Sequence, residues 1–403
     1  MRPRHLAYVL LAGALIGLWF SSVSTYDFVA HLDRQVHGIH CSFLPGIAAP
    51  VADGGGCQVT MMSPYSSLFR QSLWGGIPLS LMAMATFAFL VFWAVGLLVF
   101  KRLEDPKAAL FTLAATLLPF GMTLIMGYLS LTKLNTVCKQ CMGIYTASTI
   151  AFGAGFALYW RSRTTAPSDN DLSWNALAGV FAVGVLFVAV PVIAYVGASP
   201  NFTRYVGTCG ELDTADGADE VLVTLGAPTG SSTMIEVLDP LCPSCRGFEE
   251  RFEKIDAADQ VTRKALLFPL DSTCNWMITE SIHPGACTLS EAVLCAGNQA
   301  DEVLQWAFSQ QEEIVSAAQA DPKAAARLVK ERFPALSSCV GTPKARAKVN
   351  LALRFAVKNR LRILTPQVYV DGLRLCDEDT DLGLEYALPR LIERARSSQG
   401  GAT

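Results

Sequence analysis

Five long stretches of this chain contain no charged residue, and they constrain its fold more than any other feature. They span Leu6–Ser24, Leu73–Phe100, Ala108–Leu131, Met142–Trp160 and Ala176–Tyr195. A hydrocarbon core of about 30 Å needs roughly 20 apolar residues in a helix, so each stretch is suited to crossing a bilayer. A single stretch could be a buried core helix, but five in succession favour membrane spans. The first could alternatively be a cleaved signal peptide, although no clear small-x-small cleavage site follows it.

The short loops predict the orientation of these spans, because lysine and arginine favour the cytoplasmic side. If the N-terminus lies inside, seven basic residues face the cytoplasm: Arg2, Arg4, Lys101, Arg102, Lys107, Arg161 and Arg163. The hairpin on the opposite side carries only Lys133 and Lys139. We therefore expect an integral, multi-pass protein of the cytoplasmic membrane with a cytoplasmic N-terminus. Everything after about residue 198 would lie on the periplasmic or extracytoplasmic side.

Charge and cysteine content narrow the class of function. A net charge of -3 argues against a nucleic-acid partner, because no basic surplus is available to neutralise phosphates. All 12 cysteines fall on the outer side in this topology, where disulfides persist. Two pairs, Cys138/Cys141 and Cys242/Cys245, have C-x-x-C spacing. In an exported region this spacing predicts redox chemistry or structural disulfides.

Cys138 and Cys141 open the fourth apolar stretch. A helix N-terminus carries a partial positive charge that stabilises a thiolate, and Lys139 adds to it. The pair can close a disulfide at a depth that suits a lipid-dissolved electron acceptor. Cys41 and Cys57 in the long outer loop predict a relay by thiol–disulfide exchange. A Cys₄ zinc site, or one structural disulfide beside a free pair, is the alternative, but the spacing of the loop cysteines does not suit zinc.

These motifs together resemble the vitamin K epoxide reductase (VKOR) family over roughly residues 5–162. The shared elements are a loop cysteine, Cys57, a serine six residues later, Ser63, and a Gly-Ile-Pro segment that opens the second span. The C-x-x-C pair is followed after four residues by Tyr145. A longer, Pro/Gly-rich interval between Cys41 and Cys57 departs from the family pattern.

The resemblance implies a four-helix bundle around a quinone, either ubiquinone or menaquinone, that acts as electron acceptor. It implies that Cys141 contacts the quinone and that Cys138 exchanges with Cys57. It also implies that Cys41 pairs with Cys57 in the loop.

Two further residues take roles only from the resemblance. Tyr145 would donate a hydrogen bond to a quinone carbonyl, and Ser63 would support the quinone site. Without the resemblance, Tyr145 reads as an interfacial belt residue and Ser63 as a turn former.

From about Glu220 the composition becomes that of a soluble domain. An apolar strand, Met234–Leu238, runs into Cys242-Pro-Ser-Cys245 at the start of a helix, and Val261–Phe268 predicts the next strand. Because this thiol pair also sits at a helix N-terminus, we expect Cys242 to be an exposed, acidic nucleophile. Cys245 would be its resolving partner.

Near the C-terminus, Pro366 precedes a strand, Val368–Val370, and an Asp371-Gly372 hairpin turn. This order resembles a thioredoxin fold, and the resemblance implies a cis proline at Pro366 beside the cysteine pair. Taken alone, the proline would be a trans turn residue. The helix-patterned residues 275–360 resemble the helical insert of DsbA-type oxidases, and Leu382–Arg396 predicts a closing helix.

Six cysteines have no short redox spacing and are expected to form structural disulfides, among fifteen possible connectivities. They are Cys209, Cys274, Cys287, Cys295, Cys339 and Cys376. We favour Cys274–Cys287, which could close a small loop. His283 lies in that loop and is expected to be structural rather than catalytic.

The predicted architecture has three parts. Residues 1–163 form a VKOR-like transmembrane four-helix domain, and 164–200 form a linker and a fifth transmembrane helix. Residues 201–403 form an α/β thioredoxin-like domain with a helical insert. The whole resembles bacterial fusions of a VKOR domain with a thioredoxin-like domain.

The predicted function is that of a quinone-dependent enzyme that generates disulfides in reduced secreted or periplasmic client proteins. Electrons would pass through Cys242/Cys245, then Cys41/Cys57, then Cys138/Cys141. One alternative is a reductase or isomerase that runs electrons outward, which would need a cytoplasm-facing thiol that this topology lacks. Another is a non-enzymatic membrane-tethered assembly protein with structural disulfides. Epoxide reduction remains open as a side activity.

Overall fold

The structure is a computed structural model that describes residues 3–31, 57, 60–61, 63–134, 137–163, 171–214, 218–227 and 230–400. The chain divides into two compact units, Met1–Pro200 and Asn201–Thr403. Cys41 lies outside the described residues, so its pairing with Cys57 stays a prediction.

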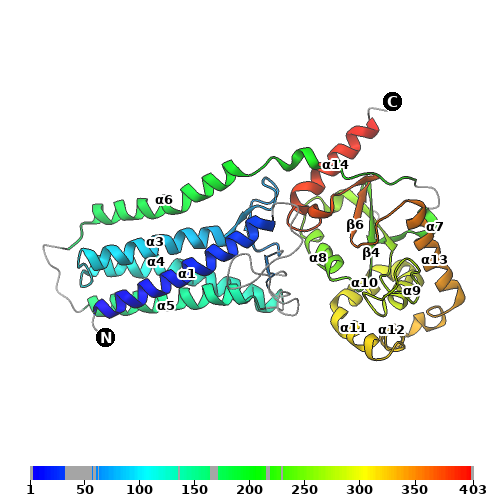
Figure 1. The fold of residues 1–403 in the computed structure, drawn as a ribbon, viewed down its shortest axis with the longest axis horizontal. Coiled ribbons are helices and arrows are strands. Elements are labelled where there is room, and N and C mark those ends of the chain that lie inside the picture. The colour runs from blue at the N-terminus through cyan, green and yellow to red at the C-terminus, as the bar shows by residue number, and fades with distance from the viewer. Residues whose placement is uncertain are drawn as a thin grey trace. The chain divides into compact units, whose positions relative to one another are not determined.

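The first unit is helical (Figure 1). Its long helices are α1 (Pro3–His31), α3 (Leu79–Val99), α4 (Pro106–Thr132), α5 (Lys139–Ser162) and α6 (Trp174–Ala198). Each is long and apolar enough to cross a membrane, so the structure contains a helix for every predicted span. A short antiparallel pair, β1 (Ser67–Leu68) and β2 (Ile77–Pro78), precedes α3.

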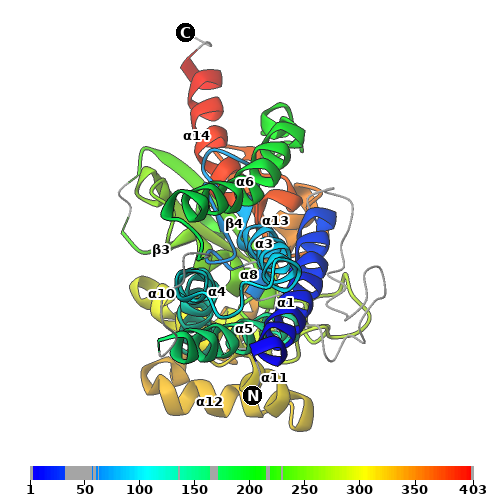
Figure 2. The ribbon, with the colours of Figure 1, turned by 90° about the vertical axis from the view of Figure 1, so that its left-hand side faces the viewer.

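Four of these helices form a bundle with α6 outside it. Helix α1 packs against α3 and α5, α4 packs against α5, and α6 packs against α3 (Figures 1 and 2). Glycines allow α1 and α5 to approach closely, because a Cβ atom at Gly143 would lie 2.5 Å from the ring of Phe20. A Cβ atom at Gly13 of α1 would lie 3.0 Å from the Ile150 side chain of α5. In α6 only Leu177 is buried.

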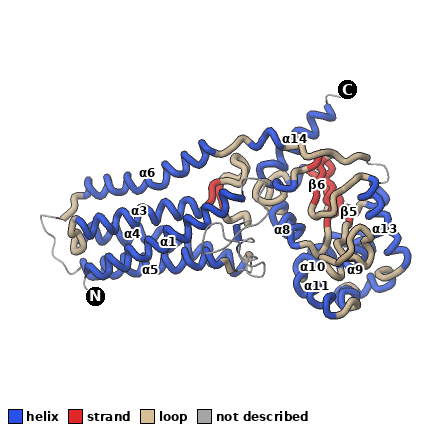
Figure 3. Tube along the Cα trace, viewed as in Figure 1, coloured by secondary structure: helices blue, strands red, loops and turns tan. Residues whose placement is uncertain are grey.

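The second unit is built on a five-stranded sheet (Figure 3). The strands are β3 (Val223–Leu225), β4 (Ser232–Leu238), β5 (Val261–Leu267), β6 (Gln367–Val370) and β7 (Leu373–Arg374), in the order β3-β5-β4-β6-β7. Strands β4 and β5 are parallel and are joined by α8 (Pro243–Phe252), while the other pairs are antiparallel. The β6–β7 turn is the predicted one, with positive φ at Asp371 and Gly372.

Helices cover both faces of this sheet. They are α7 (Ala218–Val221), α9 (Ala286–Ala296), α10 (Ala300–Ser309), α11 (Gln311–Ala320), α12 (Ala324–Arg332), α13 (Pro343–Lys358) and α14 (Leu384–Gly400). On one face, Phe248 and Phe252 of α8 share a core with Leu388 of α14. On the other, Leu353 of α13 packs with Phe268. With α9–α13 inserted between β5 and β6, the unit is a thioredoxin-like fold with a helical insert, and the predicted fold class is confirmed.

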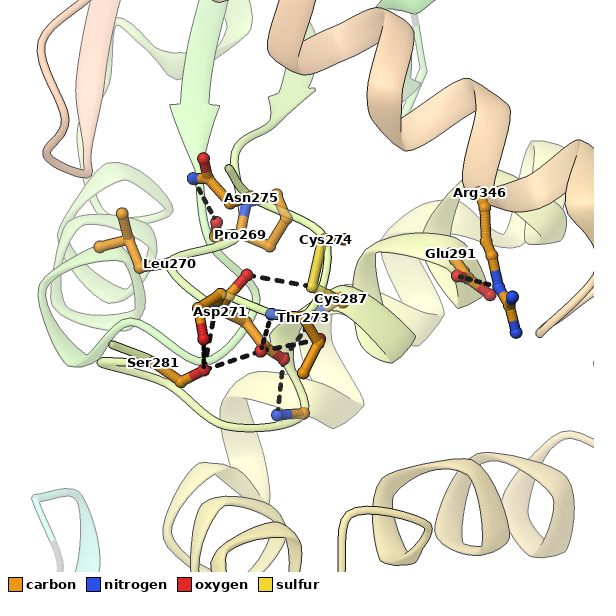
Figure 4. Close-up of a disulfide and its surroundings, with 12 residues drawn as sticks. Pro269, Leu270, Asp271, Thr273, Cys274, Asn275, Ser281, Cys287, Glu291 and Arg346 are labelled. Carbon is orange, nitrogen blue, oxygen red and sulfur yellow. Dashed lines mark hydrogen bonds and ion pairs between the residues drawn. A yellow bond between two sulfur atoms is a disulfide. The ribbon is translucent and has the colours of Figure 1, made fainter. Parts of the chain in front are cut away.

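The insert begins later than its sequence pattern predicts. Residues 271–285 form a loop, and the first helix starts at Ala286 (Figure 4). The Asp271 carboxylate explains this difference, because it accepts hydrogen bonds from the Thr273 hydroxyl, the Ser281 hydroxyl and the Gly285 N–H. These bonds satisfy hydrogen-bond donors of the loop, so the segment does not need to form a helix.

All six remaining cysteines of the second unit form disulfides. The predicted Cys274–Cys287 disulfide is confirmed and closes the loop drawn in Figure 4. The other two link Cys209 to Cys376 and Cys295 to Cys339.

Candidate functional site

Three thiols meet at the start of α5. Cys138 is the N-cap of this helix, and its Sγ accepts a hydrogen bond from the Cys141 N–H at 3.4 Å. The Sγ atom of Cys57 lies 3.5 Å from that of Cys138. Cys57 and Cys138 are buried, whereas Cys141 is partly exposed. The family resemblance implied that these three residues act together, and the fold brings them close to one another.

This geometry suits disulfide exchange. The Cys57–Cys138 separation is about 1.5 Å longer than a disulfide bond, so a small side-chain movement would join the two sulfurs. Exchange proceeds by attack of a thiolate on a disulfide sulfur. Cys138 lies between Cys57 and Cys141, and so it can form a disulfide with either of them.

A buried carboxylate anchors the residue between the two cysteines of this pair. The Gln140 side chain donates a hydrogen bond of 2.8 Å to Asp27 of α1, and both side chains are buried. An ionisable residue inside a membrane helix is expensive and usually functional. The Asp27–Gln140 bond fixes the start of α5 against α1.

Ser63 belongs to a polar network in the loop that follows Cys57. Its hydroxyl donates to the Thr60 carbonyl at 2.7 Å, and its own carbonyl accepts from the guanidinium of Arg70. Arg70 is buried and also donates to the hydroxyls of Ser66 and Ser67. Ser63 therefore supports the loop backbone through its local bonds.

Tyr145 lies one turn after Cys141 on α5 and is half-buried. Its phenol hydroxyl makes no hydrogen bond to any residue within the described ranges of the chain. Residues four apart share a helix face. A thiol and an unpaired phenol on one partly open face fit a quinone, which needs a reductant and a hydrogen-bond donor to a carbonyl oxygen.

The second thiol pair sits between β4 and the cis-proline loop. Cys242 is the N-cap of α8, and its Sγ donates to the Thr365 carbonyl at 3.5 Å. The peptide bond from Thr365 to Pro366 is cis, as the thioredoxin resemblance implies. The Gln311 side chain donates to the Cys242 carbonyl at 2.9 Å.

Cys242 was expected to be exposed, and this expectation is wrong. Its exposed fraction is 5%, because the cis-proline loop and the helical insert close over the start of α8. Its acidity is as expected. Hydrogen bonds from the Cys245 thiol and from the Cys245 N–H lower the pKa of Cys242 to about 6, against the opposing effect of burial. Burial raises the pKa of Cys245, as befits a resolving thiol.

A cluster of buried charges joins α8 to the central strands of the sheet. Arg263 of β5 donates to Glu236 of β4 at 2.8 Å and to Glu249 of α8 at 2.9 Å, and its guanidinium lies 4.6 Å from the ring centroid of Phe252. Gln305 donates to the same Glu249 carboxylate. Burial raises the pKa of Glu236, and the charge of Arg263 opposes that rise. The cluster ties α8 to the two central strands.

Sequence reasoning missed several polar residues of both sites. Asp27 is an acidic residue just after an uncharged run, and Arg70 is a basic residue just before another. Glu236 is an acidic residue within an apolar strand. A charged residue within or beside an apolar segment was the available signal.

Comparison with known proteins finds a family match in the first unit. Residues 8–156 match the model of the vitamin K epoxide reductase family. No curated protein matches the chain.

Solved structures are similar to about half of the chain. A thioredoxin-like oxidoreductase from Silicibacter pomeroyi DSS-3 is 19% identical, covers 44% of this chain and 97% of its own, and has a TM-score of 0.29. Wolbachia pipientis alpha-DsbA1 is 16% identical. The match covers 45% of this chain and 92% of the Wolbachia chain, with a TM-score of 0.32. A linker-deletion mutant of Proteus mirabilis ScsC is 18% identical. The match covers 57% of this chain and 100% of the ScsC chain, with a TM-score of 0.31. At these identities and TM-scores, the fold of the second unit rests on its own topology.

Proposed function

We propose that this chain is a membrane thiol–disulfide oxidoreductase, because its residues 8–156 match the vitamin K epoxide reductase family. It makes disulfides in reduced client proteins and delivers the electrons to a quinone. The observation that carries this proposal is the cluster of Cys57, Cys138 and Cys141 at the start of α5, with the first two sulfurs 3.5 Å apart.

The first exchange takes place in the soluble unit. A client thiolate attacks the Cys242 sulfur of the Cys242–Cys245 disulfide and forms a mixed disulfide, and Cys245 leaves as a thiolate. The second client thiolate then attacks the client sulfur of the mixed disulfide and releases Cys242. The client gains one disulfide, and two electrons now reside in the Cys242/Cys245 dithiol. The low pKa of Cys242 makes it a good leaving group in the second step.

Two further exchanges move the same electron pair toward the membrane. Cys242 reduces a Cys41–Cys57 disulfide, and Cys245 resolves the mixed disulfide. Cys57 then attacks Cys138 of the Cys138–Cys141 disulfide, and Cys41 resolves that intermediate. The membrane pair ends as a dithiol, and the loop pair is again a disulfide.

Cys141 and Tyr145 would hold the quinone on the partly open face of α5. A bound quinone would supply an acceptor for two electrons and two protons from the Cys138/Cys141 dithiol. Tyr145 offers the hydrogen bond to a carbonyl oxygen, while burial of Cys138 keeps it from reacting with other thiols.

The orientation follows from charge. The five candidate spans would put the two ends of the helical region on opposite sides of the membrane, and the basic residues favour a cytoplasmic N-terminus. The soluble unit then shares the periplasmic compartment with the cysteine-bearing loops. Reduced secreted proteins are the clients found there.

The test uses the purified full-length protein in detergent, with a reduced unfolded client and ubiquinone or menaquinone followed by absorbance. Cys141→Ala should abolish quinone reduction. Its Cys138 thiolate can still attack Cys57 of the Cys41–Cys57 disulfide and release Cys41, and the resulting Cys57–Cys138 disulfide, which mass spectrometry can identify, should accumulate because no Cys141 thiol is present to displace Cys57. A matched control, Cys295→Ala/Cys339→Ala, removes a disulfide outside the relay and should keep turnover. Undiminished quinone reduction by Cys141→Ala would refute the relay.

A further inference from the structure

The loop at residues 271–285 places a histidine beside the turn that carries Cys242. The loop is held by the Cys274–Cys287 disulfide and by the Asp271 hydrogen bonds (Figure 4). The His283 N–H donates to the Leu270 carbonyl at 3.0 Å. These contacts fix the loop backbone at His283.

The imidazole of His283 contacts a buried carboxylate. Its Nδ1 lies 2.9 Å from Oδ2 of Asp239, whose side chain is fully buried, while 13% of the His283 side chain is exposed. Asp239 directly follows β4 and stands three residues before Cys242. Its Oδ2 also accepts a hydrogen bond from the Leu270 N–H.

Asp239 is bonded to the reactive turn itself. Its Oδ1 accepts from the Leu241 N–H at 2.7 Å, and its backbone carbonyl accepts from the Cys242 N–H at 3.1 Å. A carboxylate so close to a thiol disfavours the thiolate, and the negative charge of Asp239 does raise the pKa of Cys242. A positive group on Asp239 would remove this penalty.

We propose that His283 is a positioning residue for Cys242: its imidazolium pairs with Asp239, offsets that carboxylate and favours the Cys242 thiolate. The inference rests on the proposed redox role of Cys242. The Pro-Ser dipeptide between the two cysteines contains no basic residue, so the positive charge comes from another part of the fold.

The electrostatics of the neighbouring groups agree with this geometry. Burial alone would lower the pKa of His283, but the hydrogen bond and charge of Asp239, with a contribution from Cys242, raise it. Imidazolium therefore persists to a higher pH than for a free histidine, and its effect is lost as the pH rises through the pKa in the folded protein.

Other charged groups near this turn already have partners. Asp271 accepts bonds within its own loop, and Arg246 of α8 forms an ion pair with Glu312 of α11. Glu280 is exposed to solvent. Among the described residues in these elements, His283 is the basic group in contact with Asp239.

The predicted consequence is a more oxidising disulfide. A positive charge that stabilises the Cys242 thiolate stabilises the reduced form of the pair and so raises its reduction potential. With the higher reduction potential, the Asp239–His283 pair favours transfer of electrons from clients to Cys242/Cys245.

The test measures the Cys242/Cys245 equilibrium in the full-length protein with glutathione buffers and mass spectrometry, independently of quinone. His283→Gln keeps a hydrogen-bond donor but removes the charge. It should shift the equilibrium toward the disulfide by about threefold to tenfold, the larger value corresponding to about 30 mV. Lys264→Gln, which removes a charge paired with the exposed Asp219, is the control and should leave the equilibrium unchanged.

A double variant separates charge from shape. In His283→Gln/Asp239→Asn both charges are gone, so the equilibrium should return to within about twofold of wild type. If His283 has only a structural role, the Cys242/Cys245 equilibrium of the double variant should instead be shifted as far as that of the single variant, or further. If the double variant does not fold, the pH profile of Cys242 alkylation in the wild type and in His283→Gln tests the proposal. Wild type should show two transitions and His283→Gln only one, and identical profiles would overturn the proposal. Because these measurements do not involve the membrane thiols, this failure is distinct from failure of the relay.

Discussion

The two C-x-x-C pairs of this protein occupy the same position in their helices but have different neighbours. Cys138 and Cys242 are both N-caps, of α5 and α8, and each is followed by its partner one turn later. Beside Cys138 lies a third sulfur, that of Cys57. Beside Cys242 lie the Thr365 carbonyl and the Asp239–His283 pair.

The difference teaches what each pair can do. A third sulfur in contact offers an immediate partner for exchange, so the membrane pair is arranged for transfer within the chain. In the proposed function, the carbonyl, carboxylate and imidazole groups instead tune a thiol that reacts with client proteins. The position in the helix is the same, so the neighbours account for the difference between the two pairs.

Removing the third sulfur should have the largest effect. Cys57→Ala deletes the sulfur 3.5 Å from Cys138, so electrons from the client should stop at Cys242/Cys245 and steady-state quinone reduction should fall to background. Alkylation of Cys242 should stay at the wild-type rate. Mass spectrometry of the reduced soluble pair under turnover provides the check, and continued turnover would show that the loop cysteine is dispensable.

The buried charges under the second pair predict the next largest effect. Arg263→Met leaves Glu236 and Glu249 without their cation, which should destabilise the soluble unit by about 3–5 kcal/mol. Formation of the Cys57–Cys138 disulfide, followed in a Cys141→Ala background, should be unaffected. Thermal unfolding of the full-length protein measures the change.

The neighbouring Lys264→Met is the matched control for that prediction. Its partner Asp219 is exposed, and such pairs contribute about 0–1 kcal/mol. Equal losses for the two variants would mean that the Arg263 cluster has no special role in stability.

Sequence patterns predicted the elements well because they reflect repetitive physics. Uncharged runs of about 20 residues gave the long helices, and the strand and turn signals around Asp371-Gly372 gave the β6–β7 hairpin. The Cys274–Cys287 disulfide was also predictable, since the two cysteines lie only 13 residues apart. Each of these features depends on residues that are near in sequence.

The missed features depend on distant residues. The burial of Cys242 arises from the cis-proline loop more than 100 residues later, and the Asp239–His283 contact joins residues 44 apart. His283 was expected to be structural rather than catalytic, and no sequence spacing indicated its contact with Asp239. The Asp27–Gln140 bond joins α1 to α5, and no periodicity within one helix reports it.

The pH dependence of Cys242 alkylation tests this comparison through a smaller effect. With a pKa of about 6, Cys242 is a thiolate above that pH and loses its charge as the pH falls through it. Alkylation of Cys242 should therefore fall by about tenfold between pH 7 and pH 5. Iodoacetamide labelling with peptide mass spectrometry gives the profile. A midpoint near 8.5, the value for free cysteine, would mean that the groups around Cys242 do not tune it.

The smallest expected effect concerns the carboxylate beside the membrane pair. Asp27→Leu removes the acceptor of the Gln140 hydrogen bond that fixes the start of α5 against α1. Loss of one buried hydrogen bond of about 1 kcal/mol should slow Cys57–Cys138 disulfide formation roughly fivefold, measured by quenched alkylation in a Cys141→Ala background. Asp27→Asn keeps an oxygen acceptor for the Gln140 amide and should stay within about twofold of the parent. If both variants slow exchange equally, the charge of Asp27 matters more than its bond to Gln140, and the membrane pair would then be tuned by a buried carboxylate much as Cys242 is by Asp239.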